Sequence, residues 1–336
     1  MPTKPDIHDT KIIKCLEDAY ALCVESVTYL PLGADFQTTV YRVTTSQGPS
    51  YFLKVRSGPF LEASVTVPKH LWDLGARHVI SPLPTKNGNL WVTLGSAKAI
   101  LYPYIEGCTG ADTPLSKEQW SAFGAAVKKL HLTRFPKNIT KDTPKEQFSS
   151  TSGGTLKDLL TYIESGTFEK PVAAKTAMFL QSKSAELLDV IRKTEDLAQR
   201  LKNSPFNYVL CHADLHGWNL MIDQCGALYV VDWDTLIFAP KERDLMFIGA
   251  GIWDSILTWT EEETLFYEGY GQVFLDQEAL CYYRFERILN DIKEYCDHIF
   301  VSGDTDDAAL SQSFDYLASN FRPAGTLARA YASWTS

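Results

Sequence analysis

The sequence predicts an α+β protein with two lobes, a small antiparallel-sheet lobe followed by a larger helical lobe. In the first third of the 336 residues, short runs rich in Val, Tyr, Phe and Ile alternate with glycines, which is typical of an antiparallel sheet. In the remainder, apolar residues recur at helical spacing. Hydrophobic residues make up 45% of the chain, which is enough for two packed cores. We expect the lobes to span residues 1–104 and 105–336.

The first lobe is expected to begin with a helix over residues 11–24, where the apolar spacing is close to helical and Asp9 or Thr10 is available as a cap. The hydrophobic pattern then changes to that of strands. Strands are expected within residues 27–45, 50–56 and 90–104. Asn87-Gly88 suits a hairpin turn before the last of these regions.

A second helix, over residues 61–74, is expected to interrupt the strands and to end at Gly75, because glycine readily adopts the left-handed conformation found after a helix. Pro68 lies inside this segment. Proline has no backbone N–H to donate, so Pro68 either kinks the helix or marks its first turn. The sequence leaves both alternatives open.

The larger lobe is expected to be helical. Ser116 followed by Gln119 fits a capping box at the start of a helix whose apolar residues share one face. Residues 136–155 are rich in Lys, Thr, Ser, Pro and Gly and predict a solvated connection. One long helix is expected at about residues 177–201, and helices with mostly buried aromatic residues are expected beyond Asp244.

Composition limits the class of protein. A net charge of −9 argues against a nucleic-acid surface, which needs an excess of Lys and Arg, and it favours a cationic ligand. The seven cysteines include no C-x-x-C pair, as expected for a reducing cytoplasm rather than a disulfide framework. No apolar run is long enough for a membrane helix, and the first residues lack the apolar core of a signal peptide. We expect a cytoplasmic monomer without a membrane or nucleic-acid partner.

The residues suited to chemistry are concentrated between His212 and Asp234. The pattern H-x-D-x-x-x-x-N contains Asp214 and Asn219, and a hydrophobic strand then leads to Asp232-x-Asp234. Phosphoryl transfer from a nucleotide needs a carboxylate to accept the hydroxyl proton, and hard oxygen ligands to hold Mg²⁺ against the phosphates. We predict Asp214 as the catalytic base, and Asn219 and Asp232 as metal ligands. Each residue alone is compatible with an ordinary loop position, but the ordered set between predicted strands favours a site.

Lys54 is the best candidate for a cation that binds the nucleotide phosphates. A lysine within a strand commonly faces solvent, but Lys54 follows a glycine-containing turn and precedes a helix that has a carboxylate near its start. That carboxylate belongs to Glu62, which is predicted to pair with the ammonium group and to orient it. The position of Glu62 depends on how Pro68 shapes the helix.

Two further segments are predicted to hold the nucleotide. Residues 32–39, with Gly33 and Thr38, would cover the phosphates, although this loop has one glycine in place of the G-x-G-x-x-G of protein kinases. The adenine is expected to pair with the backbone of the linker residues Tyr102, Tyr104 and Ile105. Pro103 has no N–H, so the donor must come from one of its neighbours.

Together these residues resemble the aminoglycoside phosphotransferase and choline kinase family, and within it the spectinomycin phosphotransferases. The likeness continues through the run Ala239-Pro240-x-x-x-Asp244-Leu245. It implies a bilobal protein-kinase-like fold, with a nucleotide-binding lobe over 1–104 and a lobe over 105–336 that carries the catalytic loop (residues 212–219) and the acceptor site. It also implies transfer of the γ-phosphate of ATP, with Mg²⁺ as cofactor, to a hydroxyl of an aminocyclitol or aminoglycoside antibiotic, spectinomycin, with antibiotic resistance as the result.

The resemblance assigns supporting roles as well. His212 and Asp244 would fix the shape of the catalytic loop, Asp244 by accepting backbone N–H bonds. Asp234 stands where relatives commonly have Gly or Glu, and it would be a further metal ligand or contact an amine of the acceptor. The short interval between Asp234 and Asp244 leaves no space for an activation loop. This argues against a protein kinase and for a small-molecule acceptor.

Two alternatives remain at this point. The first is a metabolic kinase that acts on choline, homoserine, methylthioribose or another small alcohol. The second is a metal-dependent hydrolase in which His212 and His216, four residues apart, bind a transition metal together with Asp214. A non-catalytic binding module is not favoured, because neither the base nor a metal ligand is missing.

Overall fold

The structure is a computed structural model that describes residues 7–32, 37–250 and 257–334. The chain forms two compact units. The first unit contains Met1–Pro144, His212–Ile237 and Phe266–Gly271, and the second contains Lys145–Cys211, Phe238–Leu265 and Gln272–Ser336. These units group residues by contact, whereas the expected division after residue 104 concerns nucleotide and acceptor binding and stays a prediction. Among the helices of the described ranges, none is both long enough and apolar enough to cross a membrane.

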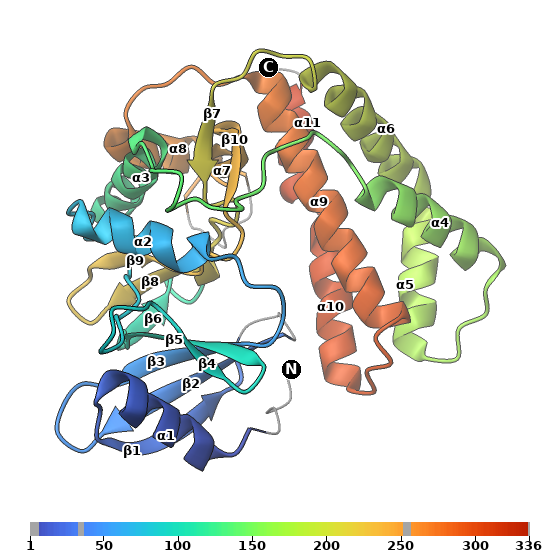
Figure 1. Ribbon diagram of the computed structural model, residues 1–336. Coiled ribbons are helices and arrows are strands. Elements are labelled where there is room, and N and C mark those ends of the chain that lie inside the picture. The colour runs from blue at the N-terminus through green and yellow to red at the C-terminus, as the bar shows by residue number, and fades with distance from the viewer. Residues whose placement is uncertain (1–6, 33–36, 251–256, 335–336) are drawn as a thin grey trace. The chain divides into compact units, whose positions relative to one another are not determined.

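The first unit is built on a five-stranded antiparallel sheet, as predicted. Its strands lie in the order β1 (Val24–Leu30), β2 (Thr38–Thr45), β3 (Tyr51–Arg56), β5 (Ala97–Pro103) and β4 (Val92–Leu94). Helix α1 (Asp9–Tyr20) covers one face, where Ile12 and Leu16 are buried with Leu53 and Val55 (Figure 1). Because successive residues of a strand face opposite sides, Lys54 points away from this core.

The structure corrects two local predictions in this unit. The residue that caps α1 is His8, which makes no side-chain capping bond, and Asp9 is already helical. Asn87-Gly88 does form a turn, in which Gly88 has a φ of 80°, but among the described residues no strand lies between β3 and this turn. The hairpin lies instead between β4 and β5, where Gly95 adopts a φ of 63° that residues with a Cβ seldom adopt.

Helix α2 (Ala63–Asp73) follows β3 and ends just before Gly75, whose φ of 84° fits its predicted role. Pro68 lies in the interior of α2, five residues after Ala63, so of the two alternatives left open, the one in which it marks the first turn is excluded. A proline inside a helix removes one hydrogen bond. The buried side chains of α2, among them Val65 and Leu71, offset this cost through packing.

The segments with the predicted chemistry also belong to the first unit. The 3₁₀ turn η1 (Gly217–Asn219) leads into an antiparallel sheet of β6 (Gly107–Thr109), β8 (Leu220–Asp223) and β9 (Leu228–Val230). The hairpin of β8 and β9 returns the chain to its start, where the Val231 N–H donates to the Asn219 carbonyl at 3.0 Å. The catalytic loop and the segment that follows β9 therefore lie side by side.

Helix α3 (Lys117–Leu132) begins with the predicted capping box. Ser116 Oγ accepts from the Gln119 N–H at 3.2 Å, and Gln119 Oε1 accepts from the Ser116 N–H at 2.8 Å. The predicted apolar face is buried, and Phe123 packs edge-on against Phe266 of α8 (Trp259–Tyr270), with ring centroids 5.2 Å apart. The capping residues and the buried face together fix where α3 begins and which side it buries.

Helices α3 and α8 approach each other closely at two glycines. A Cβ on Gly124 would lie 2.1 Å from the Phe266 carbonyl oxygen, and one on Gly269 would lie 1.8 Å from the Ser121 carbonyl oxygen. Gly124→Ala is therefore expected to lower the free energy of unfolding by about 1–3 kcal/mol or more, measured by denaturant unfolding. Gly154→Ala in α4 (Ser152–Ser165) is the matched control, because its added Cβ meets nothing within 4 Å. Equal stability of the two variants would contradict this packing.

The second unit is mainly helical. Helix α9 (Gln277–Phe300) packs against α4, α6 (Ser184–Leu201), α10 (Asp307–Ser319) and α11 (Thr326–Trp334) (Figure 1). The unit also contains α5 (Pro171–Ser182), β7 (Tyr208–Cys211), β10 (Ile237–Pro240) and α7 (Glu242–Leu245), and β7 pairs with β10. The α+β class that the sequence predicts is confirmed.

Two helix predictions in the second unit need correction. The single helix expected at residues 177–201 is two helices, α5 and α6, because Lys183 leaves the helical conformation with a ψ of 4°. Helix α4 begins inside the connection expected at residues 136–155. The expectation that aromatic residues beyond Asp244 lie mostly in the core is confirmed for Phe266, Tyr282, Tyr283 and Phe285, all of which are buried.

Candidate active site

The catalytic loop folds around the carboxylate of Asp214. Asn219 donates from its side-chain amide to Asp214 Oδ2 at 3.0 Å and to the Asp214 carbonyl oxygen at 2.8 Å. His216 approaches the same carboxylate oxygen, with 3.2 Å between Nε2 and Oδ2. Two polar side chains of this short loop therefore hold the predicted base in one orientation.

His212 connects the catalytic loop to the segment that follows β9. Its ring is fully buried. Its Nδ1 accepts a hydrogen bond from the Asp214 N–H at 3.3 Å, and its Nε2 lies 3.0 Å from the Val231 carbonyl oxygen. Because a carbonyl oxygen can only accept, this pattern assigns the ring proton to Nε2. Thr235 Oγ1 also donates to the His212 carbonyl oxygen at 2.7 Å. Both ring nitrogens are thus engaged, which disfavours the hydrolase alternative with its histidine pair on a metal.

Two residues of the site have a strained backbone. Ala213 has a φ of 68° and Asp232 a φ of 60°, values in the left-handed region that is unfavourable for residues with a Cβ. Such residues persist only where the surrounding structure holds them, and they concentrate at functional sites. His212 does so here, because its two hydrogen bonds go to the backbone groups of Asp214 and Val231, each adjacent to one of the strained residues.

Lys54 contacts the segment that follows β9, 178 positions further along the chain. Its ammonium nitrogen lies 2.8 Å from Asp232 Oδ1 and 2.7 Å from Asp234 Oδ2. Arg56, two residues later on β3, also pairs with Asp234 Oδ2. The Lys54 side chain is 11% exposed, so these carboxylates replace water as its environment. The structure thus brings together the predicted phosphate-binding cation and two predicted metal ligands.

The charges in this cluster stabilise one another. Burial acts to lower the pKa of Lys54, but the carboxylates of Asp232 and Asp234 raise the pKa above its ordinary value. For Asp232, partial desolvation by the surrounding protein acts to raise the pKa, but the charge and hydrogen bond of Lys54 outweigh it and hold the pKa below its usual range. At neutral pH Lys54 is therefore protonated and Asp232 is ionised.

The structure gives less support to three other predicted nucleotide-binding residues. Glu62 stands directly before α2, and in the described part of the chain it forms no ion pair or hydrogen bond with Lys54. Thr38 is the first residue of β2 and is half-buried. Gly33 lies outside the described residues. The nucleotide-binding roles of these three residues stay predictions.

The linker residues Tyr102, Tyr104 and Ile105 follow or end β5 and are half-buried. The Tyr104 N–H donates to the Ser50 carbonyl oxygen at 3.3 Å, so this group is engaged within the sheet lobe. The guanidinium of Arg42 lies 4.4 Å from the centre of the Tyr104 ring and also pairs with Glu106. Arg42, which was not singled out from the sequence, lies on β2 and is separated from β5 by β3.

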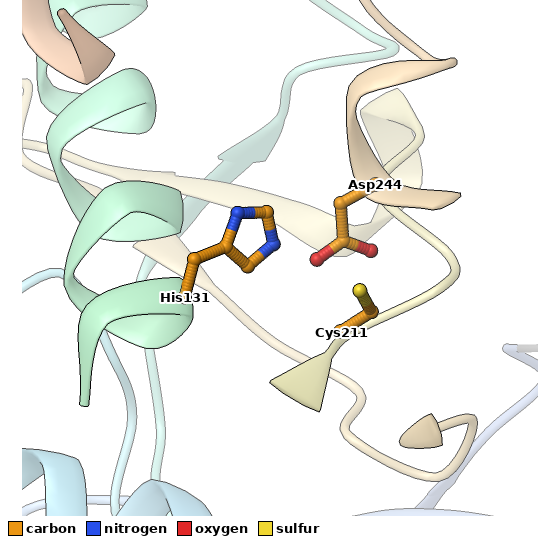
Figure 2. Close-up of side chains that lie close together, drawn as sticks. All are labelled: His131, Cys211 and Asp244. Carbon is orange, nitrogen blue, oxygen red and sulfur yellow. The ribbon is translucent and has the colours of Figure 1, made fainter. Parts of the chain in front are cut away.

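Asp244 belongs to the second unit, where it is fully buried in α7. Its carboxylate lies within 4.8 Å of the Sγ of Cys211, the residue before His212, and Figure 2 shows these two side chains directed toward each other. Burial and then the Asp244 charge raise the pKa of the Cys211 thiol well above its usual range, so the thiol stays protonated. The predicted contact of Asp244 with the catalytic loop itself stays a prediction.

Asn219 and Asp232 offer the oxygen ligands that Mg²⁺ binds. Asn219 directs its amide N–H groups to Asp214, which leaves its side-chain oxygen as the atom suited to a cation. The Asp232 carboxylate is 49% exposed and hence accessible. Asp234 fits less well, because it is 22% exposed and its Oδ2 already faces two cations. The residues present therefore fit a divalent cation at Asn219 and Asp232.

Comparisons with known proteins identify the family and the fold of this chain. The phosphotransferase enzyme family APH matches residues 28–281. Among solved structures, spectinomycin phosphotransferase in complex with ADP and spectinomycin is 29% identical, with 99% of this chain and 100% of that chain covered and a TM-score of 0.89. The choline kinase LicA from Streptococcus pneumoniae shares the fold at 19% identity, with 92% and 98% covered and a TM-score of 0.55.

A curated relative, protein StrN of Streptomyces griseus, is 25% identical over 180 residues, which are 52% of this chain and 55% of that protein. The match therefore spans about half the length of that relative. The kinase-like fold and the family resemblance that the motifs predicted are both confirmed. Since the family match covers most of the sequence, this chain belongs to the phosphotransferase enzyme family and is a kinase with a hydroxyl group as its acceptor.

Proposed function

We propose that this protein transfers the γ-phosphate of ATP, in the presence of Mg²⁺, to a hydroxyl of spectinomycin or a closely similar aminocyclitol and so confers antibiotic resistance. The observation that carries the proposal is the arrangement of Asp214 and Asn219 beside the contact between Lys54 and Asp232, all within one compact unit. The similarity over nearly the whole chain to a spectinomycin phosphotransferase supports the choice of acceptor.

In this proposal Asp214 accepts the proton of the acceptor hydroxyl as the oxygen attacks the γ-phosphorus, while the bond from the γ-phosphorus to the β,γ-bridging oxygen breaks and ADP leaves. The hydrogen bond from Asn219 and the approach of His216 keep the carboxylate in place before the acceptor arrives. A base that is already oriented lowers the entropic part of the barrier. The acceptor needs only to place its hydroxyl against Asp214.

Asn219 and Asp232 would hold Mg²⁺, which neutralises charge on the phosphates when it is bound. Lys54 would contact the phosphates with its protonated ammonium group. The backbone of Tyr102, Tyr104 and Ile105 would bind the adenine, with Gly33 and Thr38 beside the phosphates. Of these proposed roles, that of Lys54 has the strongest geometric support, because its ammonium group already lies beside Asp232.

The acceptor is expected to be a cationic small molecule. The net charge of −9 attracts cations, and aminocyclitols carry protonated amines at neutral pH. An uncharged or anionic alcohol would gain nothing from this field. An aminocyclitol antibiotic and a cationic metabolite such as choline both meet this condition, and turnover measured with each of them separates the two.

We expect purified protein to consume ATP when spectinomycin is added, and to form a phosphorylated product detected by mass spectrometry. Choline, homoserine and methylthioribose, tested at equal concentration, are expected to give at most a small fraction of that rate. Cells that express the wild-type protein should tolerate more spectinomycin than cells that express Asp214→Ala. Faster turnover of one of the three metabolites, without resistance, would assign the protein to small-alcohol metabolism instead.

A further inference from the structure

Four charged side chains form a compact cluster at the end of β3. Lys54 and Arg56 are two residues apart on this strand, so both project from the same face of the sheet. Both cations pair with Oδ2 of Asp234, and Lys54 also pairs with Asp232. Two cations thus face two carboxylates. Of the four residues, Asp234 is the one that touches both cations.

The two carboxylates of the cluster differ in exposure. The Asp232 side chain is 49% exposed and the Asp234 side chain is 22% exposed. A carboxylate that binds a metal together with a nucleotide must be reachable, whereas one that orients a neighbouring side chain is better shielded from water, because its interactions are then stronger. The more accessible Asp232 suits the ligand role, and the more enclosed Asp234 suits the structural one.

Glu62 was the expected partner of Lys54, but these two residues form no ion pair or hydrogen bond within the described ranges. A buried ammonium group needs a counter-charge, since an uncompensated buried charge is strongly unfavourable. If Asp232 binds a metal, Asp234 is the carboxylate that remains paired with Lys54.

We propose that Asp234 is the positioning residue of this kinase: it holds Lys54 in place for the nucleotide phosphates, and Arg56 anchors Asp234 in turn. The proposal rests on the proposed function, and it gives Asp234 a role other than the metal ligand that the sequence predicted. Arg56 is itself fixed, because its Nε donates to the Pro59 carbonyl oxygen at 2.5 Å. The chain of contacts runs from the Pro59 backbone through Arg56 and Asp234 to the ammonium group of Lys54.

The first test is Asp234→Asn, which keeps the shape of the side chain and removes its charge. Loss of a hydrogen bond to a charged group corresponds to a decrease of about 10- to 100-fold in kcat/KM for ATP. The Mg²⁺ concentration for half-maximal rate is expected to stay as in the wild type. Asp73→Asn is the matched control, because Asp73 pairs with Lys69 on the exposed surface of α2. A shift in the Mg²⁺ requirement would overturn the proposal in favour of a metal ligand.

The second test replaces Arg56, the residue proposed to anchor Asp234. Arg56→Met is expected to reproduce part of the loss, and the double variant Arg56→Met/Asp234→Asn should be no worse than Asp234→Asn alone, since both changes break the same chain of contacts. Additive losses would overturn the proposed coupling. Glu62→Gln separates the two possible partners of Lys54: a loss in kcat/KM for ATP as large as that of Asp234→Asn would return the role to Glu62.

Thermal unfolding of each variant separates misfolding from mispositioning. Asp234→Glu keeps the negative charge and is expected to recover part of the ATP affinity. If Asp234→Asn unfolds, Arg56→Met with its intact carboxylate still tests the coupling to Lys54. Full activity of Asp234→Asn, alongside an inactive Asp214→Ala, would contradict the positioning role and leave the proposed function intact. Failure of the wild-type protein to phosphorylate spectinomycin would contradict the proposed function itself.

Discussion

Asp214→Ala is expected to lower kcat by about 10²- to 10⁴-fold, the usual scale for the loss of a positioned general base. The affinity for nucleotide is expected to persist, because the phosphate contact is assigned to Lys54, which pairs with Asp232 and Asp234 rather than with Asp214. Isothermal titration with a non-hydrolysable ATP analogue, together with steady-state kinetics, measures the two quantities separately. A drop in kcat without a drop in nucleotide affinity is the signature of a group that acts in the transition state.

Asp214→Asn is a more conservative substitution of the same residue. It keeps the size of the side chain, so the packing around His216 and Asn219 changes little, yet an amide cannot accept the proton as a carboxylate does. Its kcat should therefore be as low as that of Asp214→Ala. Wild-type turnover in either variant would mean that another group accepts the proton, and the assignment of the base would fail.

Much of the fold was predictable because its signals are local. The capping box of Ser116 and Gln119 lies within four residues, and the strand pattern around Lys54 repeats over a few positions. The catalytic pattern from His212 to Asn219 is also local, so the hydrogen bonds from Asn219 to Asp214 follow from neighbours in the chain. Short-range geometry of this kind is set by backbone conformation and residue type alone.

Long-range pairing left no such signal. Arg56 and Asp234 are 178 positions apart, and nothing in the chain between them indicates which cation meets which carboxylate. The break between α5 and α6 at Lys183 was missed for a different reason, since neither Pro nor Gly marks it. Pro68, by contrast, is an obvious break signal that the structure overrides, because buried neighbours on α2 maintain the helix. For Pro68 and for the pairing of Arg56 with Asp234, tertiary packing, which the sequence does not display, decides the outcome.

Asp232→Asn is expected to abolish the part of nucleotide binding that depends on Mg²⁺. Replacing a residue that hydrogen-bonds to a metal ligand commonly lowers the affinity for the metal by about 10- to 100-fold. Replacing the ligand itself is therefore expected to lower it by about 100-fold or more. Titration of ATP in the presence of Mg²⁺, and again with EDTA, measures the metal-dependent part directly. Asp234→Asn is the comparison, because its loss should persist equally with and without the metal.

The two variants therefore separate the two carboxylates that lie on Lys54. In Asp232→Asn the ammonium group keeps Asp234 as its counter-charge, so the residual, metal-independent affinity for ATP should remain close to that of the wild type in EDTA. In Asp234→Asn the metal ligand remains, and the residual affinity falls instead. Metal-dependent binding that survives in Asp232→Asn would place the cation elsewhere. The strained backbone of Asp232, with its φ of 60°, would then not be explained by a role as a metal ligand.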